Sequence, residues 1–372
     1  MTTLAGGRVV TPDGILEPGW VQVADGRIAA TGSNPAPQPA HDVRGAWVLP
    51  GFVDLHVHGG GGHDFTSSAS AIEFGAAAHA EHGTTRLLVS LMAGHLDAMC
   101  EQLSWVSALA GGDSGVLGAH VEGPFLAHAR CGAQNREHLL APDAQVLAKL
   151  LDAGAGCVRT MTVAPELPGA LEVIADIRAA GVVAAIGHTD ADYAEARAGF
   201  DAGASLATHL FNAMPALAHR APGAAGAALD SGAACELIND GVHVHPAMVR
   251  LAARAAAGPL VFVTDAISAT GVGDGDYPLG DQTVTVRSGQ ARLPATGRLA
   301  GSTLTMDDAL RRAVREVGLP IERASAAASG NPARVLGLDG ELGTIAVGRL
   351  ADLVILDDDL TVQGVMRGGI WL

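Results

Sequence analysis

The middle of the chain alternates between short apolar runs and alanine-rich stretches. The runs suit strands buried in a parallel sheet, and helical patterns separate most of them, for example at 69–83, 190–203 and 245–258. Eight β/α units in roughly 280 residues predict an α/β protein with a (β/α)8 TIM-like barrel. The expected strands are Phe52–His58, Arg86–Leu91, Val116–Val121, Val158–Val163, Val182–His188, Ser205–Phe211, Cys235–Asn239 and Leu260–Asp265.

A doubly wound open sheet is the competing layout for the same alternation. We rank it lower because no GxGxxG motif leads from a strand into a helix. After the eighth strand, residues 273–298 read as a β-like insert, with turn signals at Asp274-Gly275 and Ser288-Gly289.

Both ends of the chain have strand patterns. "GWVQVADGRIAATG" contains two alternating runs joined by Asp25-Gly26, which favours a type I′ hairpin, and "NPAPQPAHD" predicts a loop. "LGTIAVGRLADLVILDDD" and "VQGVMRGGIWL" near the C-terminus are similar. We therefore expect residues 1–50 and 338–372 to form a small β-sandwich domain, and residues 51–337 to form the catalytic barrel.

Composition narrows the range of partners. The 372 residues are 48% hydrophobic and carry a formal net charge of −16, which argues against nucleic acid and anionic membranes as partners. A small anionic ligand is still compatible with this charge if arginines gather at its binding site. The four cysteines are scattered without a CxxC, and neither a signal peptide nor a long apolar span is evident. We expect a cytoplasmic protein.

A histidine or carboxylate stands at the end of most expected strands. In "DLHVHGGGGHD", His56 and His58 point to one face of a strand, and the glycines at 59–62 leave room and permit unusual turns. Structural histidines and a flexible loop are the alternatives. Buried ionisable groups need partners, however, and a divalent metal at the barrel mouth supplies one. The strand-end residues are His56, His58, His120, Glu122, His188, His209, His243 and Asp265.

This arrangement resembles the amidohydrolase superfamily of metal-dependent hydrolases. In that superfamily HxH ends strand one, single histidines end strands five and six, and an aspartate ends strand eight. Most binuclear members bridge their metals with a carbamylated lysine on strand four. Here Lys149 is the only lysine and lies in a helical stretch, so Glu122 on strand three is the expected replacement.

The motifs "HVEGPF", "IGHTDA", "THLFNAMP", "NDGVHV" and "LAGSTLTM" are similar, in order, to those of the N-acetylglucosamine-6-phosphate deacetylase family. The resemblance implies hydrolysis of N-acetyl-D-glucosamine 6-phosphate to glucosamine 6-phosphate and acetate. A galactosamine-6-phosphate deacetylase, another amidohydrolase and a non-catalytic binding protein with the same fold are the alternatives. Dihydroorotase-like and dipeptidase-like enzymes fit less well because they use the lysine bridge.

The resemblance also assigns roles. It implies two divalent metal ions per chain, with zinc favoured and iron, manganese or cadmium as alternatives. Asp265 is the expected catalytic acid and base, and can also be a simple metal ligand. The implied metal ligands are His56, His58, Glu122, His188, His209 and Asp265. The implied substrate-binding residues are Ala133, Gln134, Asn212, Ala213, Arg220, His243, Leu299, Ala300 and Gly301.

One position departs from the family. Many members have Gly-Ala-His after "EGPF", and that histidine helps to polarise the acetyl carbonyl, whereas this chain has Gln134 there. Glutamine donates only neutral hydrogen bonds, so the oxyanion would depend more on the metals. Nearby Cys131 is expected to be inert rather than reactive. The resemblance further implies a homodimer, in which Arg220 or His243 reaches the neighbouring subunit's site.

Overall fold

The computed structural model describes residues 1–33 and 35–372, so the first residue of the expected loop 34–42 lies outside the described residues. The chain divides into two compact units. One consists of Met1–Asp54, His79–Arg86 and Thr305–Leu372, and the other of Leu55–Ala78 and Leu87–Leu304. The expected domain limits at residues 50 and 338 stay a prediction, because these two units follow spatial contacts and each combines several segments of the chain.

Eight parallel strands form the barrel. Their order is β15-β14-β13-β12-β11-β10-β9-β6, and a parallel bridge between Val57 and Ala266 joins the two ends of this series. The amide of Asp265 also donates to the carbonyl of His56 at 2.8 Å. The strands are β6 (Phe52–Val57), β9 (Thr84–Met92), β10 (Val116–Glu122), β11 (Val158–Val163), β12 (Val183–Ile186), β13 (Leu206–Ala207), β14 (Ala234–Ile238) and β15 (Leu260–Val263).

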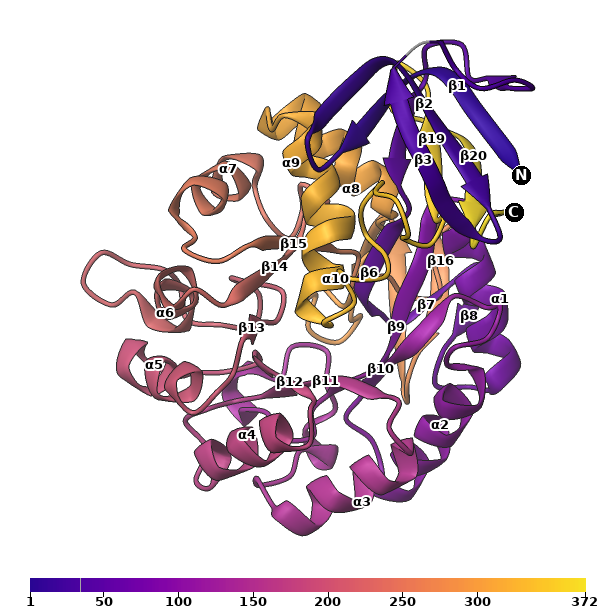
Figure 1. The fold of residues 1–372 in the computed structure, drawn as a ribbon. Coiled ribbons are helices and arrows are strands. Elements are labelled where there is room, and N and C mark those ends of the chain that lie inside the picture. The colour runs from indigo at the N-terminus through magenta and orange to yellow at the C-terminus, as the bar shows by residue number, and fades with distance from the viewer. Residues whose placement is uncertain (34) are drawn as a thin grey trace. The chain divides into compact units, whose positions relative to one another are not determined.

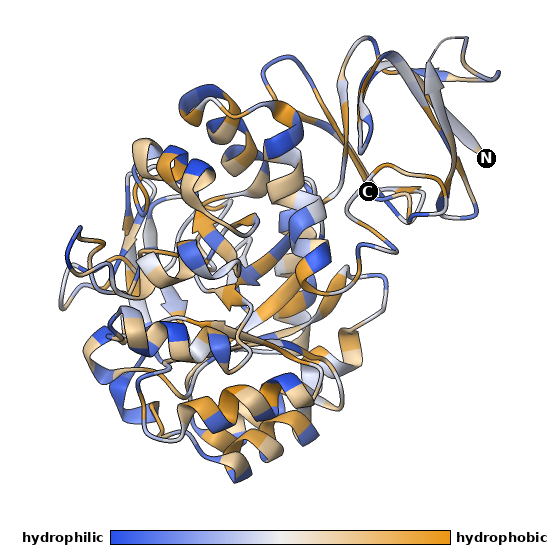
Figure 2. Cartoon of the chain, turned by 60° about the vertical axis from the view of Figure 1, so that its left-hand side comes forward, coloured by the Kyte–Doolittle hydropathy of each residue, from blue (hydrophilic) through white to orange (hydrophobic). Residues whose placement is uncertain are grey.

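Each barrel strand is followed in the chain by a helix, which confirms the (β/α)8 pattern. Figure 1 shows α2 to α7 around the outside of the strands, and Figure 2 shows helices of mixed hydropathy around mainly hydrophobic strands. Local signals start some helices: Asp192 and Glu195 form a capping box on α5. The helices are α1 (Ala69–Ala80), α2 (Leu96–Leu109), α3 (Ala144–Gly154), α4 (Ala170–Ala179), α5 (Tyr193–Asp201), α6 (Gly223–Ser231), α7 (Pro246–Ala255) and α8 (Met306–Arg312).

The expected insert is present between β15 and α8. It forms a three-stranded antiparallel sheet of β16 (Gly275–Leu279), β17 (Gln282–Arg287) and β18 (Gln290–Arg292). Ser288-Gly289 turns the chain between β17 and β18, as expected. Asp274-Gly275 does not make the other turn; instead the Asp274 carboxylate accepts from the amides of Ser288 and Gly289.

Both termini contribute to one further sheet, in the order β21-β20-β19-β5-β1-β2-β3, with β4 paired to β1. This confirms a β domain built from both ends of the chain. Asp25 and Gly26 both have positive φ, as a type I′ hairpin between β2 and β3 requires. The strands are β1 (Thr2–Thr11), β2 (Gly14–Ala24), β3 (Arg27–Ser33), β4 (His41–Asp42), β5 (Trp47–Pro50), β19 (Leu353–Leu356), β20 (Val362–Arg367) and β21 (Ile370–Trp371).

The remaining elements are short. They are β7 (Gly59–Gly60), β8 (His63–Asp64), the 3-10 helices η1 (His128–Arg130) and η2 (Arg136–His138), the π-helical turns η3 (Ala313–Val317) and η4 (Ala326–Gly330), and the helices α9 (Ile321–Ser325) and α10 (Asn331–Val335). Among the described residues, no helix combines the length and apolar character that crossing a membrane needs.

Candidate active site

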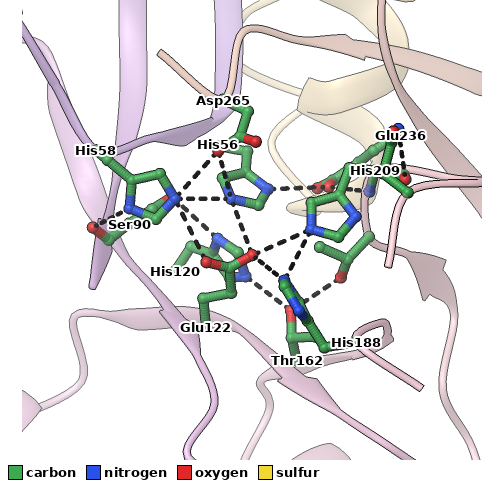
Figure 3. A network of polar contacts seen from close by, with 12 residues as sticks. His56, His58, Ser90, His120, Glu122, Thr162, His188, His209, Glu236 and Asp265 are labelled. Atoms are coloured by element: carbon green, nitrogen blue, oxygen red, sulfur yellow. Dashed lines mark hydrogen bonds and ion pairs between the residues drawn. The ribbon is translucent and has the colours of Figure 1, made fainter. Parts of the chain in front are cut away.

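Six buried ionisable side chains converge at the C-terminal ends of the barrel strands (Figure 3). They come from five different strands or from the residues directly after them, so only the closed barrel brings them together. The structure thus gathers every metal ligand that the family resemblance implied. The six are His56, His58, Glu122, His188, His209 and Asp265.

Three of these residues have an unusual backbone. His188, His209 and Asp265 each stand two residues after the last residue of a strand, and their φ angles are 48°, 28° and 50°. Positive φ in a residue other than glycine costs on the order of 1–3 kcal/mol and is concentrated at functional sites. It also explains why β12, β13 and β15 end earlier than their apolar runs: the left-handed residue interrupts the extended conformation.

The first group of donors consists of His56, His58 and Asp265. The two Nε2 atoms are 3.1 Å apart, and Asp265 Oδ1 lies 3.4 Å from His56 Nε2 and 3.2 Å from His58 Nε2. His56 lies in β6 and His58 directly follows its last residue, so the two are two residues apart and both imidazoles point toward the other donors (Figure 3). Three potential ligand atoms therefore meet at one point.

The second group consists of Glu122, His188 and His209. Glu122 Oε1 is 3.0 Å from His188 Nε2 and 3.2 Å from His209 Nε2, and these two nitrogens are 3.0 Å apart. Glu122 also reaches the first group, since Oε1 is 3.3 Å from His56 Nε2 and Oε2 is 3.4 Å from His58 Nε2. One carboxylate therefore contacts both groups.

The donor chemistry fits a metal ion in each group. Within each group the ligand atoms lie within 4.8 Å of one another and are buried. Imidazole nitrogens and carboxylate oxygens this close repel through their lone pairs unless a proton or a metal cation lies among them. Histidine and carboxylate are also the ligands that zinc and related divalent metals take.

The electrostatics of the site favour a cation. Burial alone would lower the pKa of His56, yet Glu122 and Asp265 raise it well above its usual value. Against the same effect of burial, these carboxylates raise the pKa of His58 to about 9. Burial would raise the pKa of Asp265, but His56 and His58 lower it to about 2. The carboxylates are therefore anionic at neutral pH and attract a positive charge.

Surrounding acceptors fix three of the four imidazoles. The Nδ1 atoms of His56, His58 and His188 contact Glu236 Oε2 at 3.3 Å, the Ser90 carbonyl at 3.2 Å and the Arg130 carbonyl at 2.9 Å. Such partners orient metal-binding histidines and leave Nε2 as the ligand atom. The buried Nδ1 of His209 has no such partner among the described residues.

His120 lies under the site rather than in it. Its ring packs edge-on against that of His56, with centroids 4.5 Å apart, and it contacts the hydroxyls of Ser90 at 3.0 Å and Thr162 at 2.8 Å. Burial, and then the neighbouring His56, hold the pKa of His120 well below its usual value. A neutral imidazole in this place supports the ligands without competing for the cation.

A cavity of about 330 Å³ opens over the two groups, within the size range of small-molecule sites. The carboxylate of Asp240 holds His243 at its wall, with Oδ2 2.6 Å from His243 Nδ1. Most substrate-binding residues implied by the resemblance line this cavity. They are Ala133, Gln134, Asn212, Ala213, His243, Leu299 and Gly301.

Two implied substrate residues are placed elsewhere. Arg220 is exposed and lines a separate hollow beside Asp190 and Tyr193. Ala300 is buried under the cavity wall, with 1% of its surface exposed. Its neighbour Gly301 has a φ of 60° and sits so close to Ile267 and the Asp265 carbonyl that a side chain would collide with them.

The glycines at 59–62 serve the backbone rather than the cavity wall. None of them is among the residues that line the cavity. A side chain on Gly59 would collide with the carbonyl of His63 in the neighbouring strand β8, and Gly61 and Gly62 have positive φ. The expected unusual turns are present, whereas the expected room at the mouth does not come from these glycines.

Two further sequence features lie outside the donor groups. Lys149 is on α3, and its Nζ lies 2.6 Å from Asp97 Oδ1, so it pairs on the surface. Cys131 is buried, and Arg136 Nε lies 3.3 Å from its sulfur. The inertness of Cys131 stays a prediction.

The sequence analysis missed three residues of the site. Glu236 contacts both His56 and the amide of His209, and a lone carboxylate inside the apolar strand Ala234–Ile238 was the available signal. Arg130 and Arg298 line the cavity from loops. Nothing in the spacing of either arginine marked it as part of the site.

Comparison with known proteins agrees with this geometry. Residues 47–372 match the model of the amidohydrolase family. The N-acetylglucosamine-6-phosphate deacetylase of Bacillus subtilis is 35% identical over 378 residues, covering 97% of this chain and 95% of that protein. The N-acetylgalactosamine-6-phosphate deacetylase of Escherichia coli O157:H7 is 36% identical over 367 residues, covering 97% of each.

A solved structure is similar over the whole chain. The N-acetyl-D-glucosamine-6-phosphate deacetylase of Mycobacterium smegmatis is 42% identical, with a TM-score of 0.96 and complete coverage of both chains. A mutant of that enzyme has been solved in complex with N-acetyl-D-glucosamine-6-phosphate.

Proposed function

The chain belongs to the amidohydrolase family, and we propose that it hydrolyses the acetamide of N-acetyl-D-glucosamine 6-phosphate, releasing acetate and glucosamine 6-phosphate. The observation that carries this proposal is the pair of buried donor groups joined by Glu122 beneath a cavity of about 330 Å³. The names of relatives at 35–42% identity support the same substrate.

We propose that each donor group holds one divalent metal ion. His56, His58 and Asp265 would hold one, and Glu122, His188 and His209 the other, with Glu122 contacting both groups in place of a lysine. Zinc is favoured by this donor set, with iron, manganese and cadmium as alternatives. Metal ions bound there would lower the pKa of water and polarise an acetamide oxygen.

The chain's own residues move the proton. Asp265 lines the cavity, so its carboxylate can accept the proton of the attacking water. As the water oxygen bonds to the acetyl carbon and the carbon–nitrogen bond breaks, the same proton passes to the leaving amine. Asp265 ends the cycle ionised, as it began.

Positive side chains at the cavity would bind the phosphate of the substrate. Arg298 lines the cavity, Arg130 lines it while pairing with Asp190 at 2.7 Å, and His243 stands on its wall. The overall charge of −16 repels a sugar phosphate, so attraction has to come from such local groups. The backbone of Asn212 and Ala213, which also line the cavity, would add polar contacts.

We propose a homodimer, because the family resemblance implies that Arg220 binds substrate. It lies outside the cavity of its own chain, so it would reach a substrate only in a second copy, where Arg220 of the partner subunit completes the phosphate site. His243 needs no such arrangement because it lines the cavity of its own chain. Analytical ultracentrifugation at assay concentration checks this: a fully active monomer would contradict it.

We place the enzyme in the cytoplasm. All four cysteines are free thiols, which suits a reducing compartment. A phosphorylated sugar is also charged and does not cross membranes unaided.

A second candidate substrate is N-acetyl-D-galactosamine 6-phosphate, which the E. coli relative's name favours at 36% identity. The test is acetate release from both hexosamine phosphates and from unphosphorylated N-acetylglucosamine, after metal reconstitution. We expect the highest kcat/KM on the glucosamine derivative. A preference for the galactosamine derivative would exchange the candidates, and no acetate from any of them would favour a binding protein.

A further inference from the structure

A buried glutamine touches the carboxylate that connects the two donor groups. Gln134 is 4% exposed and lies in the loop between η1 and η2. Its Nε2 donates to Glu122 Oε2 at 2.6 Å, and its Oε1 accepts from the amide of Ala93 at 2.8 Å. Ala93 directly follows β9, and Glu122 ends β10, so the side chain links the ends of two neighbouring strands.

The orientation of this amide follows from its partners. A backbone N–H can only donate, so Oε1 must face Ala93 and the NH2 group must face Glu122. A flipped amide would place its NH2 against a donor and its oxygen against a carboxylate. One hydrogen of Nε2 is therefore committed to Glu122.

The contact assigns different tasks to the two oxygens of Glu122. Gln134 holds Oε2, which also lies 3.4 Å from His58 Nε2, while Oε1 faces the other three imidazoles. The distances from Oε1 to the Nε2 atoms of His56, His188 and His209 are 3.3, 3.0 and 3.2 Å. A carboxylate anchored at one oxygen cannot rotate away from the imidazoles that surround the other. Partners of this kind around metal ligands are typically worth 10- to 100-fold in metal affinity.

We propose that Gln134 is a positioning residue of the metal centre, which fixes the Glu122 carboxylate between the two donor groups. This inference rests on the proposed function only in taking these groups as metal sites. It assigns to Gln134 a task that differs from the carbonyl contact implied by the histidine found there in many family members.

The loop has anchors that do not involve the Gln134 side chain. Gln282 Nε2 donates to the carbonyl of Ala133, and Asp281 accepts from Asn135 at 2.7 Å and contacts His138 at 3.1 Å. Asp281 lies in the turn between β16 and β17, and Gln282 is the first residue of β17. Gln282 therefore offers a matched control, because its loss loosens the loop while the contact from Gln134 to Glu122 stays.

The experiment measures zinc affinity of the apoprotein by competition with a chromophoric chelator. Gln134→Met keeps the length and volume of the side chain but cannot donate to Glu122. We expect it to bind the zinc held by Glu122 about 10- to 100-fold more weakly, whereas Gln282→Met binds as the wild type does. Circular dichroism of each apoprotein checks the fold, and Gln134→Asn, too short to span both partners, serves if Gln134→Met does not fold.

Equal zinc affinity of folded Gln134→Met and wild type would overturn the inference, and so would an equal loss in Gln282→Met, which would assign the effect to the loop. Either result leaves acetate release by the wild type untouched. Absence of zinc binding by the wild type itself would overturn the proposed metal sites as well, so the two failures are distinguishable.

Discussion

The terminal β-sheet buries Leu4, Val21 and Leu353 in one apolar core, whereas the barrel mouth buries Glu122 and Asp265 in contact with His56. The sheet's burial needs no ligand, because apolar contact alone stabilises it. At the mouth, burial of charged groups and positive φ angles at three of the six donors both cost free energy. A region that bears such a cost in free energy is where we expect the functional site to lie.

We expect the largest effect on stability from a substitution in the apolar core of the terminal β-sheet. Leu353 is fully buried in this core, so Leu353→Ala should lower the free energy of unfolding by about 2–5 kcal/mol in urea titrations. Turnover of the folded protein should not change. Val347→Ala is the control, since 66% of Val347 is exposed and the change should stay within about 0.5 kcal/mol. A loss of kcat in folded Leu353→Ala would contradict the division of tasks between the regions.

At the mouth, the largest effect on chemistry should come from Asp265. Asp265→Asn cannot accept a proton, so kcat for acetate release should fall by at least ~10²-fold. We expect the variant to keep its metal, so that its turnover can be compared with that of the wild type when both are fully loaded. Metal content is measured on the same samples. Near-normal turnover in the metal-loaded variant would remove Asp265 from its role in proton transfer.

A smaller, selective effect is expected for the phosphate. Hydrogen bonds to a charged group contribute ~1.5–3 kcal/mol, so Arg220→Ala should lower kcat/KM on the 6-phosphate by at least about tenfold. Activity on unphosphorylated N-acetylglucosamine should not change. Arg298→Ala tests the cavity arginine of the same chain in parallel. An equal loss on both substrates would make either arginine structural.

The smallest effect concerns the pair of His243 and Asp240. Against the effects of burial, Asp240 raises the pKa of His243, and His243 lowers that of Asp240. Because the pKa of His243 is raised, this group stabilises the fold below the ordinary histidine value of 6.5, and the stabilisation is lost as pH rises through the pKa in the folded protein. Because the pKa of Asp240 is lowered, this group stabilises the fold above the ordinary aspartate value of 3.8.

Asp240→Asn should therefore destabilise the protein more at pH 5.5 than at pH 9, in urea titrations at both pH values. The asparagine keeps an oxygen for the amides of Val242 and His243, which Asp240 Oδ1 accepts. A destabilisation independent of pH would mean that charge plays no part in this pair.

The sequence predicted the two regions unequally. Strand ends bearing His56, His188 and Asp265 were visible because apolar runs and single polar residues are local patterns. Glu236 and Arg298 were not found, because their meeting with the site depends on how distant segments pack. The strand expected at Ser205–Phe211 shrank to Leu206–Ala207, since His209 and Phe211 take positive φ.

The most direct test of the account is the metal content of the chain. After full reconstitution with zinc and removal of loose metal, we expect two ions per chain, one for each donor group. Changing both His56 and His58 to Ala should leave one ion, held by Glu122, His188 and His209. A wild type that holds one tightly bound ion, with the same content after that double change, would contradict the two-group metal centre.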